Sequence, residues 1–142
     1  MLDIIERYFE ITNREPDQIG PLKLAYLGDA VYELIVRSIL MDNRDRSVKK
    51  MNKAAQDLVN ATTQAQIAGV IEPKLDDMEI AVFHRGRNAK NNSMSKHSDI
   101  HDYRIATGLE SLFGYWYLND QIERAVTLLQ TAVSELNLLD LK

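Results

Sequence analysis

The chain has 142 residues, of which 45% are hydrophobic and 27% are charged. This length suits one domain with a core of its own, and this composition excludes a disordered chain. The absence of cysteine excludes disulfides, thiolate metal sites and a cysteine nucleophile, and the net charge of −4 is not that of a typical nucleic-acid-binding domain.

Six helices are predicted along the chain, and no segment alternates as a strand should. Their expected spans are 2–12, 18–41, 46–71, 75–89, 99–118 and 120–138. Pro16, Pro21 and Pro73 mark breaks between them, as does a loop rich in Asn and Ser at 88–98. The predicted fold class is therefore all-α, with a single domain over 1–142. No apolar run is long enough to span a membrane and no signal peptide opens the chain, so we expect a cytoplasmic protein.

The predicted helix at 18–41 is apolar on nearly all sides. Taking about 100° per residue, one apolar stripe consists of Leu24, Leu27, Val31, Leu34 and Ile35. The opposite side carries further apolar residues, namely Leu22, Ala25, Tyr26, Val36 and Leu40. The only charges from Leu24 to Val36 are Asp29 and Glu33. Such a helix is expected to be buried, and a buried carboxylate is costly unless a cation or several donors meet it.

The predicted helix at 99–118 repeats this pattern. Its stripe is Ile105, Leu109, Leu112, Phe113 and Trp116, and Glu110 is the only charge from Ile105 to Asn119. Small residues surround Glu110 and would let a second helix approach closely; they are Ala106, Thr107, Ser111 and Gly114. If Asp29 and Glu110 face each other there, they form a site of hard oxygen ligands that suits Mg²⁺.

These acids also have structural explanations. Arg37 or Arg104 could pair with Asp29 or Glu110 instead of a metal ion. Glu33 has three alternatives: a metal ligand, an acceptor behind the ligands, or the ion-pair partner of Arg37 one turn further on.

A third acidic group follows Pro73 and consists of Asp76, Asp77 and Glu79. These acids could be taken for a metal cluster. Negative charge in the first turn of a helix is the commoner explanation, because it meets the positive end of the helix dipole. We therefore interpret the trio as a helix start.

Two basic clusters interrupt the acidic background. Five basic side chains against one acid lie between Arg44 and Lys53, and four basic side chains without an acid lie between His84 and His97. Candidate RNA contacts in the second cluster are Arg85, Arg87, Asn88, Lys90 and Lys96. Arg and Lys on a loop are what contacts to phosphate require. A solvated surface is the alternative for either cluster.

Three motifs carry a resemblance to a known family. The signature helix of the ribonuclease III catalytic domain resembles LAYLGDAVYE at 24–33, and that domain's second acidic helix resembles ESLFGY at 110–115. Together with RGRNAK at 85–90, the chain over about 21–118 is similar to Mini-ribonuclease III, a small bacterial branch of the family that consists of the catalytic domain alone.

The resemblance implies a helical homodimer that cleaves both strands of double-stranded RNA with Mg²⁺, for which Mn²⁺ can substitute, leaving 5′-phosphate ends. It places Asp29 and Glu110 as catalytic metal ligands, with Glu33 as a third catalytic candidate. It assigns RNA contact to the loop at about 85–98. The implied cellular role is maturation of the 23S ribosomal RNA precursor, with ribosomal proteins as further partners.

The chain departs from the larger ribonuclease III pattern at two positions. Ala25 and Thr107 stand where that pattern has acids, a loss that the Mini branch shares, and an acid at the position of Glu33 is typical of that branch. No separate domain for double-stranded RNA is expected. Two other classes of function stay open: a helical dimer that binds structured RNA without cutting it, and a protein–protein adaptor whose acids are structural ion-pair partners.

Overall fold

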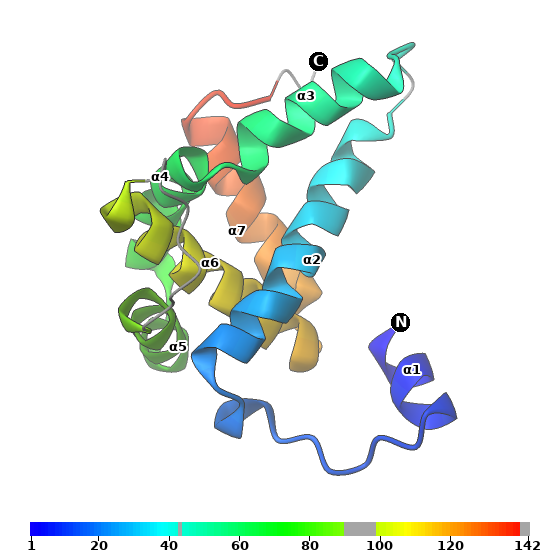
Figure 1. Cartoon of the computed structure of the whole chain (residues 1–142), viewed down its shortest axis with the longest axis vertical. Helices are drawn as coiled ribbons and strands as arrows, with labels where there is room; N and C mark the ends of the chain where they lie inside the picture. The colour runs from blue at the N-terminus through cyan, green and yellow to red at the C-terminus, as the bar shows by residue number, and fades with distance from the viewer. Residues whose placement is uncertain (43, 90–98, 140–142) are drawn as a thin grey trace.

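The computed structural model describes residues 1–42, 44–89 and 99–139, and this part of the chain contains helices and no strand. The predicted all-α class is therefore confirmed (Figure 1). The α-helices are α1 Leu2–Tyr8, α2 Pro21–Leu40, α3 Val48–Val59, α4 Ala61–Ile71, α5 Asp77–Asn88, α6 Ile100–Leu118 and α7 Ile122–Glu135. Two short 3₁₀ helices, η1 Pro16–Gln18 and η2 Glu72–Lys74, complete the list. No helix within these ranges is long and apolar enough to cross a membrane.

The predicted helix at 46–71 is wrong, because the chain turns at Asn60 and forms two helices. Asn60 has an extended ψ of 155°, and its side chain accepts a hydrogen bond from the Thr63 N–H at 2.9 Å, which starts α4. Its Nδ2 also donates to the Gln56 carbonyl at 2.9 Å, at the end of α3. The first predicted helix, 2–12, ends early at Tyr8. The other four predicted helices are present with ends that differ by a few residues.

Helix α6 is the centre of the fold and packs against α2, α4, α5 and α7 (Figure 1). Its predicted stripe is confirmed, since Leu109, Leu112, Phe113 and Trp116 are at most 1% exposed and Ile105 is half-buried. The Phe113 ring meets Tyr32 of α2 edge-on, with 5.1 Å between ring centroids. The helix that carries Glu110 is thus held on several sides.

The buried face of α2 differs from the prediction. Its buried residues are Leu24, Ala25, Gly28, Val31, Tyr32, Val36 and Leu40. Leu34, predicted for the core, is 54% exposed, and Tyr26 is 85% exposed. The expectation of a helix buried all round is therefore wrong for the single chain. The apolar pattern could not orient this helix, because α6 approaches the side that carries the small residues Ala25 and Gly28.

The acidic trio after Pro73 is confirmed as a helix start. Asp76 and Glu79 form a capping box, each side chain accepting the other's backbone N–H at 2.9 Å. Glu79 also reaches two other helices, although it is only 2% exposed. Its carboxylate accepts hydrogen bonds from Arg124 of α7 at 2.8 Å and from Trp116 Nε1 of α6 at 2.6 Å. The carboxylate of Glu79 therefore joins α5 to α6 and α7.

Candidate active site

Helices α2 and α6 cross with their backbones in contact. A Cβ atom on Gly28 would overlap the carbonyl oxygen of Glu110, and a Cβ atom on Gly114 would overlap the carbonyl oxygen of Leu24. Ser111 Oγ, also at this crossing, donates to the Pro21 carbonyl at 2.9 Å. The close approach predicted from small residues on α6 is therefore confirmed.

This crossing brings Asp29 and Glu110 together. Asp29 follows Gly28 on α2, and its carboxyl group lies within hydrogen-bonding reach of the Glu110 carboxyl on α6. Burial, the hydrogen bond with Asp29 and the charge of Asp29 raise the pKa of Glu110 to about 8. Glu110 is half-buried and Asp29 is exposed in the single chain, so the carboxyl pair opens to the surface.

Among the described residues, no ion pair joins Asp29 or Glu110 to a cationic side chain. Arg37 pairs with Glu33 instead, at 2.6 Å, and Arg104 is exposed. The structural alternative, in which an arginine neutralises the pair, is therefore not what the structure contains. Two carboxyl groups in contact without a counter-ion have a chemistry that fits a hard divalent cation.

Glu33 lies one turn beyond Asp29 on α2, half-buried, and holds Arg37 as a helix ion pair. Of its three alternatives, the ion pair is the one that the structure contains. No group of three or more His, Cys, Asp or Glu side chains that could hold a metal occurs within the residues described. A metal site in this part of the chain would therefore be built on the Asp29–Glu110 pair.

The basic end of α5 lies against the same helix. Gly86 touches α6 so closely that a Cβ atom there would overlap Ser111 Oγ and lie 2.9 Å from Gly108 Cα. On either side of Gly86, Arg85 is exposed and Arg87 lies over the Phe83 ring at 5.9 Å. These arginines and Asn88 are thus placed at the end of α5. The other candidate RNA contacts, Lys90 and Lys96, lie outside the described residues.

The first basic cluster is partly structural. Arg46 donates to the Leu40 carbonyl at 2.8 Å and pairs with Asp42 at 2.9 Å, next to the C-terminal end of α2. Arg44 approaches Asp42 at 3.5 Å. The lysines of the cluster are exposed on α3; they are Lys49, Lys50 and Lys53.

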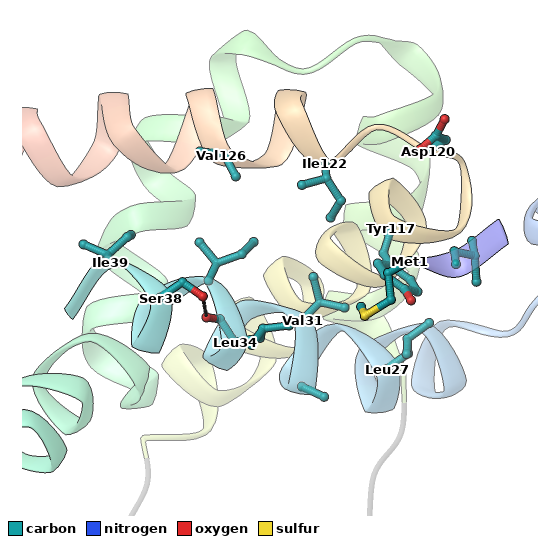
Figure 2. Close-up of a pocket in the computed structure, with 13 residues that line it drawn as sticks. Met1, Leu27, Val31, Leu34, Ser38, Ile39, Tyr117, Asp120, Ile122 and Val126 are labelled. Carbon is teal, nitrogen blue, oxygen red and sulfur yellow. Dashed lines mark hydrogen bonds between the residues drawn. The ribbon is translucent and has the colours of Figure 1, made fainter. Parts of the chain in front are cut away.

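An apolar groove that was not predicted lies beside α2 (Figure 2). The groove encloses about 750 Å³ between Leu27 and Leu34 of α2, Tyr117 of α6, and Ile122 and Val126 of α7. Its lining on α2 comes from the first apolar stripe, including Leu27, Val31 and Leu34, which were assigned to the core from the sequence. Tyr26 at 85% and Leu34 at 54% exposed show that apolar side chains of α2 stay uncovered by the part of the chain that the structure describes.

Comparisons with known proteins agree with this arrangement. The family described as "Ribonuclease III domain" matches residues 22–121, which include both acidic helices. A Mini-ribonuclease 3 of Clostridium tetani is 40% identical over 134 residues, covering 92% of this chain and 89% of the relative. A Mini-ribonuclease 3 of Desulfitobacterium hafniense is 46% identical over 111 residues, covering 78% of this chain and 70% of the relative.

A solved structure has a similar fold. The crystal structure of a Fusobacterium nucleatum protein has a TM-score of 0.73 at 28% identity and covers 83% of this chain and 94% of that protein. The family match over both acidic helices places the chain in the ribonuclease III class. Within that class, the chain belongs to the Mini-ribonuclease 3 family.

Proposed function

We propose that this chain, an endoribonuclease of the ribonuclease III type by family, cleaves both strands of double-stranded RNA as a Mg²⁺-dependent cytoplasmic homodimer. The observation that carries this proposal is the Asp29–Glu110 carboxyl pair, which is held at a helix crossing without a counter-ion. The proposed cellular substrate is the 23S ribosomal RNA precursor, in the company of ribosomal proteins.

Asp29 and Glu110 would hold the Mg²⁺ ion, for which Mn²⁺ can substitute. The ion when bound supplies a lowered pKa for water and a positive charge for the phosphate. Both carboxyl groups must be ionised to bind it, and the raised pKa of Glu110, about 8, leaves that group largely protonated near neutral pH. Metal binding is therefore expected to release a proton from Glu110. Glu33, one turn from Asp29, is the proposed third catalytic acid.

RNA contact is proposed for the basic end of α5. Arg85, Arg87 and Asn88 offer donors to phosphate oxygens, and Lys90 and Lys96 extend this set along the sequence. Double-stranded RNA presents its backbone and 2′-hydroxyl groups rather than base edges, so recognition by shape and charge is expected. Such binding should weaken steeply as salt is added.

The exposed apolar side of α2 supports the homodimer. Leu22 is 38% exposed, Tyr26 is 85% exposed and Leu34 is 54% exposed, and the groove of Figure 2 lies alongside. A contiguous apolar surface of this kind is typical of a protein–protein interface, and a two-fold pair would use the same surface on both copies. One acidic pair per protomer then accounts for cleavage of both strands.

The test is the substitution Asp29→Asn. Cleavage of duplex RNA is measured in Mg²⁺ for this variant and for the unaltered protein, and EDTA serves as the metal-free control. Asn is a neutral, weaker ligand for the metal, so cleavage should fall by at least about 10³-fold while RNA binding stays. Normal cleavage by this variant would overturn the metal assignment. Tight binding by the unaltered protein with no products in Mg²⁺ would instead establish an RNA-binding dimer.

A further inference from the structure

Helix α6 is touched at backbone distance on two different sides. One contact is the crossing with α2, which sets the position of Asp29 against Glu110. The other is the crossing with α5, where Gly86 faces Gly108 and Ser111. A Cβ atom on Gly108 would lie 2.8 Å from the Phe83 carbonyl oxygen and 3.0 Å from its ring, so neither glycine of this crossing has room for a side chain.

The residues that meet Gly86 cannot move aside easily. Ser111 is 0% exposed, and its Oγ is directed to the carbonyl oxygens of Pro21 and Thr107, both at 2.9 Å. The Gly108 contact is with backbone, which has no rotamer to change. A side chain on Gly86 would therefore push α5 away from α6 rather than rearrange α6.

The sequence places both functional groups next to this contact. Arg85 and Arg87 flank Gly86 on α5, while Glu110 stands between Gly108 and Ser111 on α6. The separation of the two helices at Gly86 therefore sets how far the backbone that carries Arg85 and Arg87 lies from the backbone that carries Glu110.

We propose that Gly86, with Gly108 opposite it, is a positioning residue for RNA. It holds Arg85 and Arg87, the proposed phosphate contacts, at a set distance from the Asp29–Glu110 carboxyl pair. This inference rests on the proposed function. A backbone phosphate held by Arg85 or Arg87 is a fixed number of nucleotides from the phosphate to be cut. If this distance changes, the arginines and the carboxyl pair no longer match the spacing of the phosphates along the RNA backbone, so the affinity for RNA falls.

The experiment compares Gly86→Ala with Gly69→Ala, whose Cβ atom would meet nothing within 4 Å. Both variants receive the same small side chain within a helix. For Gly86→Ala we expect the Kd for a duplex RNA, measured by fluorescence anisotropy in EDTA, to rise about tenfold, with a similar rise in KM. Its kcat and its Mg²⁺ affinity, the latter measured by calorimetry without RNA, should stay within about threefold of those of Gly69→Ala.

A second substitution that makes room for the new side chain distinguishes the positioning role of Gly86 from a general loss of packing. Ser111→Gly removes the Oγ and Cβ atoms that a new Cβ at position 86 would meet. The contact with Gly108 Cα at 2.9 Å remains, so the double variant Gly86→Ala with Ser111→Gly, compared with Ser111→Gly alone, should recover a part of the RNA affinity that Gly86→Ala loses. Gly108→Ala widens the same crossing from the other helix and should reproduce the Gly86→Ala defect.

Three results would overturn the inference. They are equal RNA binding by Gly86→Ala and Gly69→Ala, a parallel loss of Mg²⁺ affinity, and failure of both Gly86→Ala and Gly108→Ala to fold while Gly69→Ala folds. If the unaltered protein neither binds nor cuts duplex RNA, the proposed function itself has failed. If it cuts and Gly86→Ala behaves as Gly69→Ala does, only the positioning role is lost.

Discussion

Two glutamates on neighbouring helices, Glu79 and Glu110, meet opposite surroundings. Burial favours the protonated form of Glu79, but hydrogen bonds from Arg124, the Asp76 N–H and Trp116 outweigh it and lower the pKa of Glu79. Burial also favours the protonated form of Glu110, and there Asp29 adds to the effect, so that the pKa of Glu110 rises to about 8.

The opposite pKa shifts distinguish Glu79, which stabilises the fold, from Glu110, which is placed to bind a ligand. Glu79 has its cation, Arg124, within the chain, and removing that arginine would leave the buried Glu79 carboxylate without it. Glu110 faces a second acid at the surface, an arrangement that costs stability until a cation arrives. A group held in an unfavourable state by its surroundings is a recognised sign of a functional site.

The largest expected effect is on catalysis at Glu110. Glu110→Gln removes a charged metal ligand, so cleavage of duplex RNA in Mg²⁺ should fall by at least about 10³-fold in a single-turnover assay. The control is Glu123→Gln on the exposed side of α7, which should cleave normally. Full activity in Glu110→Gln would mean that the raised pKa marks no metal site.

The second effect is on stability at Glu79. Arg124→Ala leaves the Glu79 carboxylate buried without its cation, so the free energy of unfolding should fall by about 3–5 kcal/mol in urea titrations. The exposed Arg104→Ala is the control and should change it by less than about 0.5 kcal/mol. At low temperature the folded fraction of Arg124→Ala should still cut RNA. A loss of activity per folded molecule would contradict the separation of the two acids.

The sequence could predict the pair of Asp29 and Glu110 because each carboxylate interrupts an otherwise apolar stretch of helix. Gly114 and the other small residues beside Glu110 also marked where a second helix could come close. The role of Glu79 could not be found in this way. Its first-turn position explained its charge by itself, and Arg124 is 45 residues further along the chain, where no local spacing connects them.

Two features of the fold could not be predicted from the sequence: the orientation of α2 and the break at Asn60. Helix α2 is apolar on both sides, so periodicity could not decide which side α6 covers, and Leu34 was assigned to the wrong one. Helix formers lie on both sides of Asn60, so the break there depended on one side chain capping α4. Local patterns thus found the elements, whereas their orientation depended on contacts distant in sequence.

The next effect is a pH dependence of stability in the absence of metal. The pKa of Glu110 is higher in the folded chain, about 8, than the ordinary value of 4.5, so the folded state binds more protons between these values. Stability contributed by this group therefore falls as pH rises through that window and is level above it. As the pH rises from 5 to 9, the free energy of unfolding of Glu110→Gln should therefore increase by about 1–3 kcal/mol relative to that of the unaltered protein. Thermal unfolding across this range measures the gain, and a difference that does not change with pH would refute it.

The smallest effect expected is stabilisation by Mg²⁺. At ten times its Kd, a ligand that binds only the folded state adds about 1.4 kcal/mol, which corresponds to a rise in Tm of about 3–6 °C for a chain of this size. At a fixed Mg²⁺ concentration the rise should be larger at pH 8 than at pH 6, because Glu110 must lose its proton to bind the ion. Asp29→Asn and Glu110→Gln should lose this rise, whereas Arg124→Ala should keep it despite its lower starting Tm. An equal rise in Glu110→Gln would place the stabilising ion elsewhere, and the two glutamates would then differ in pKa without differing in function.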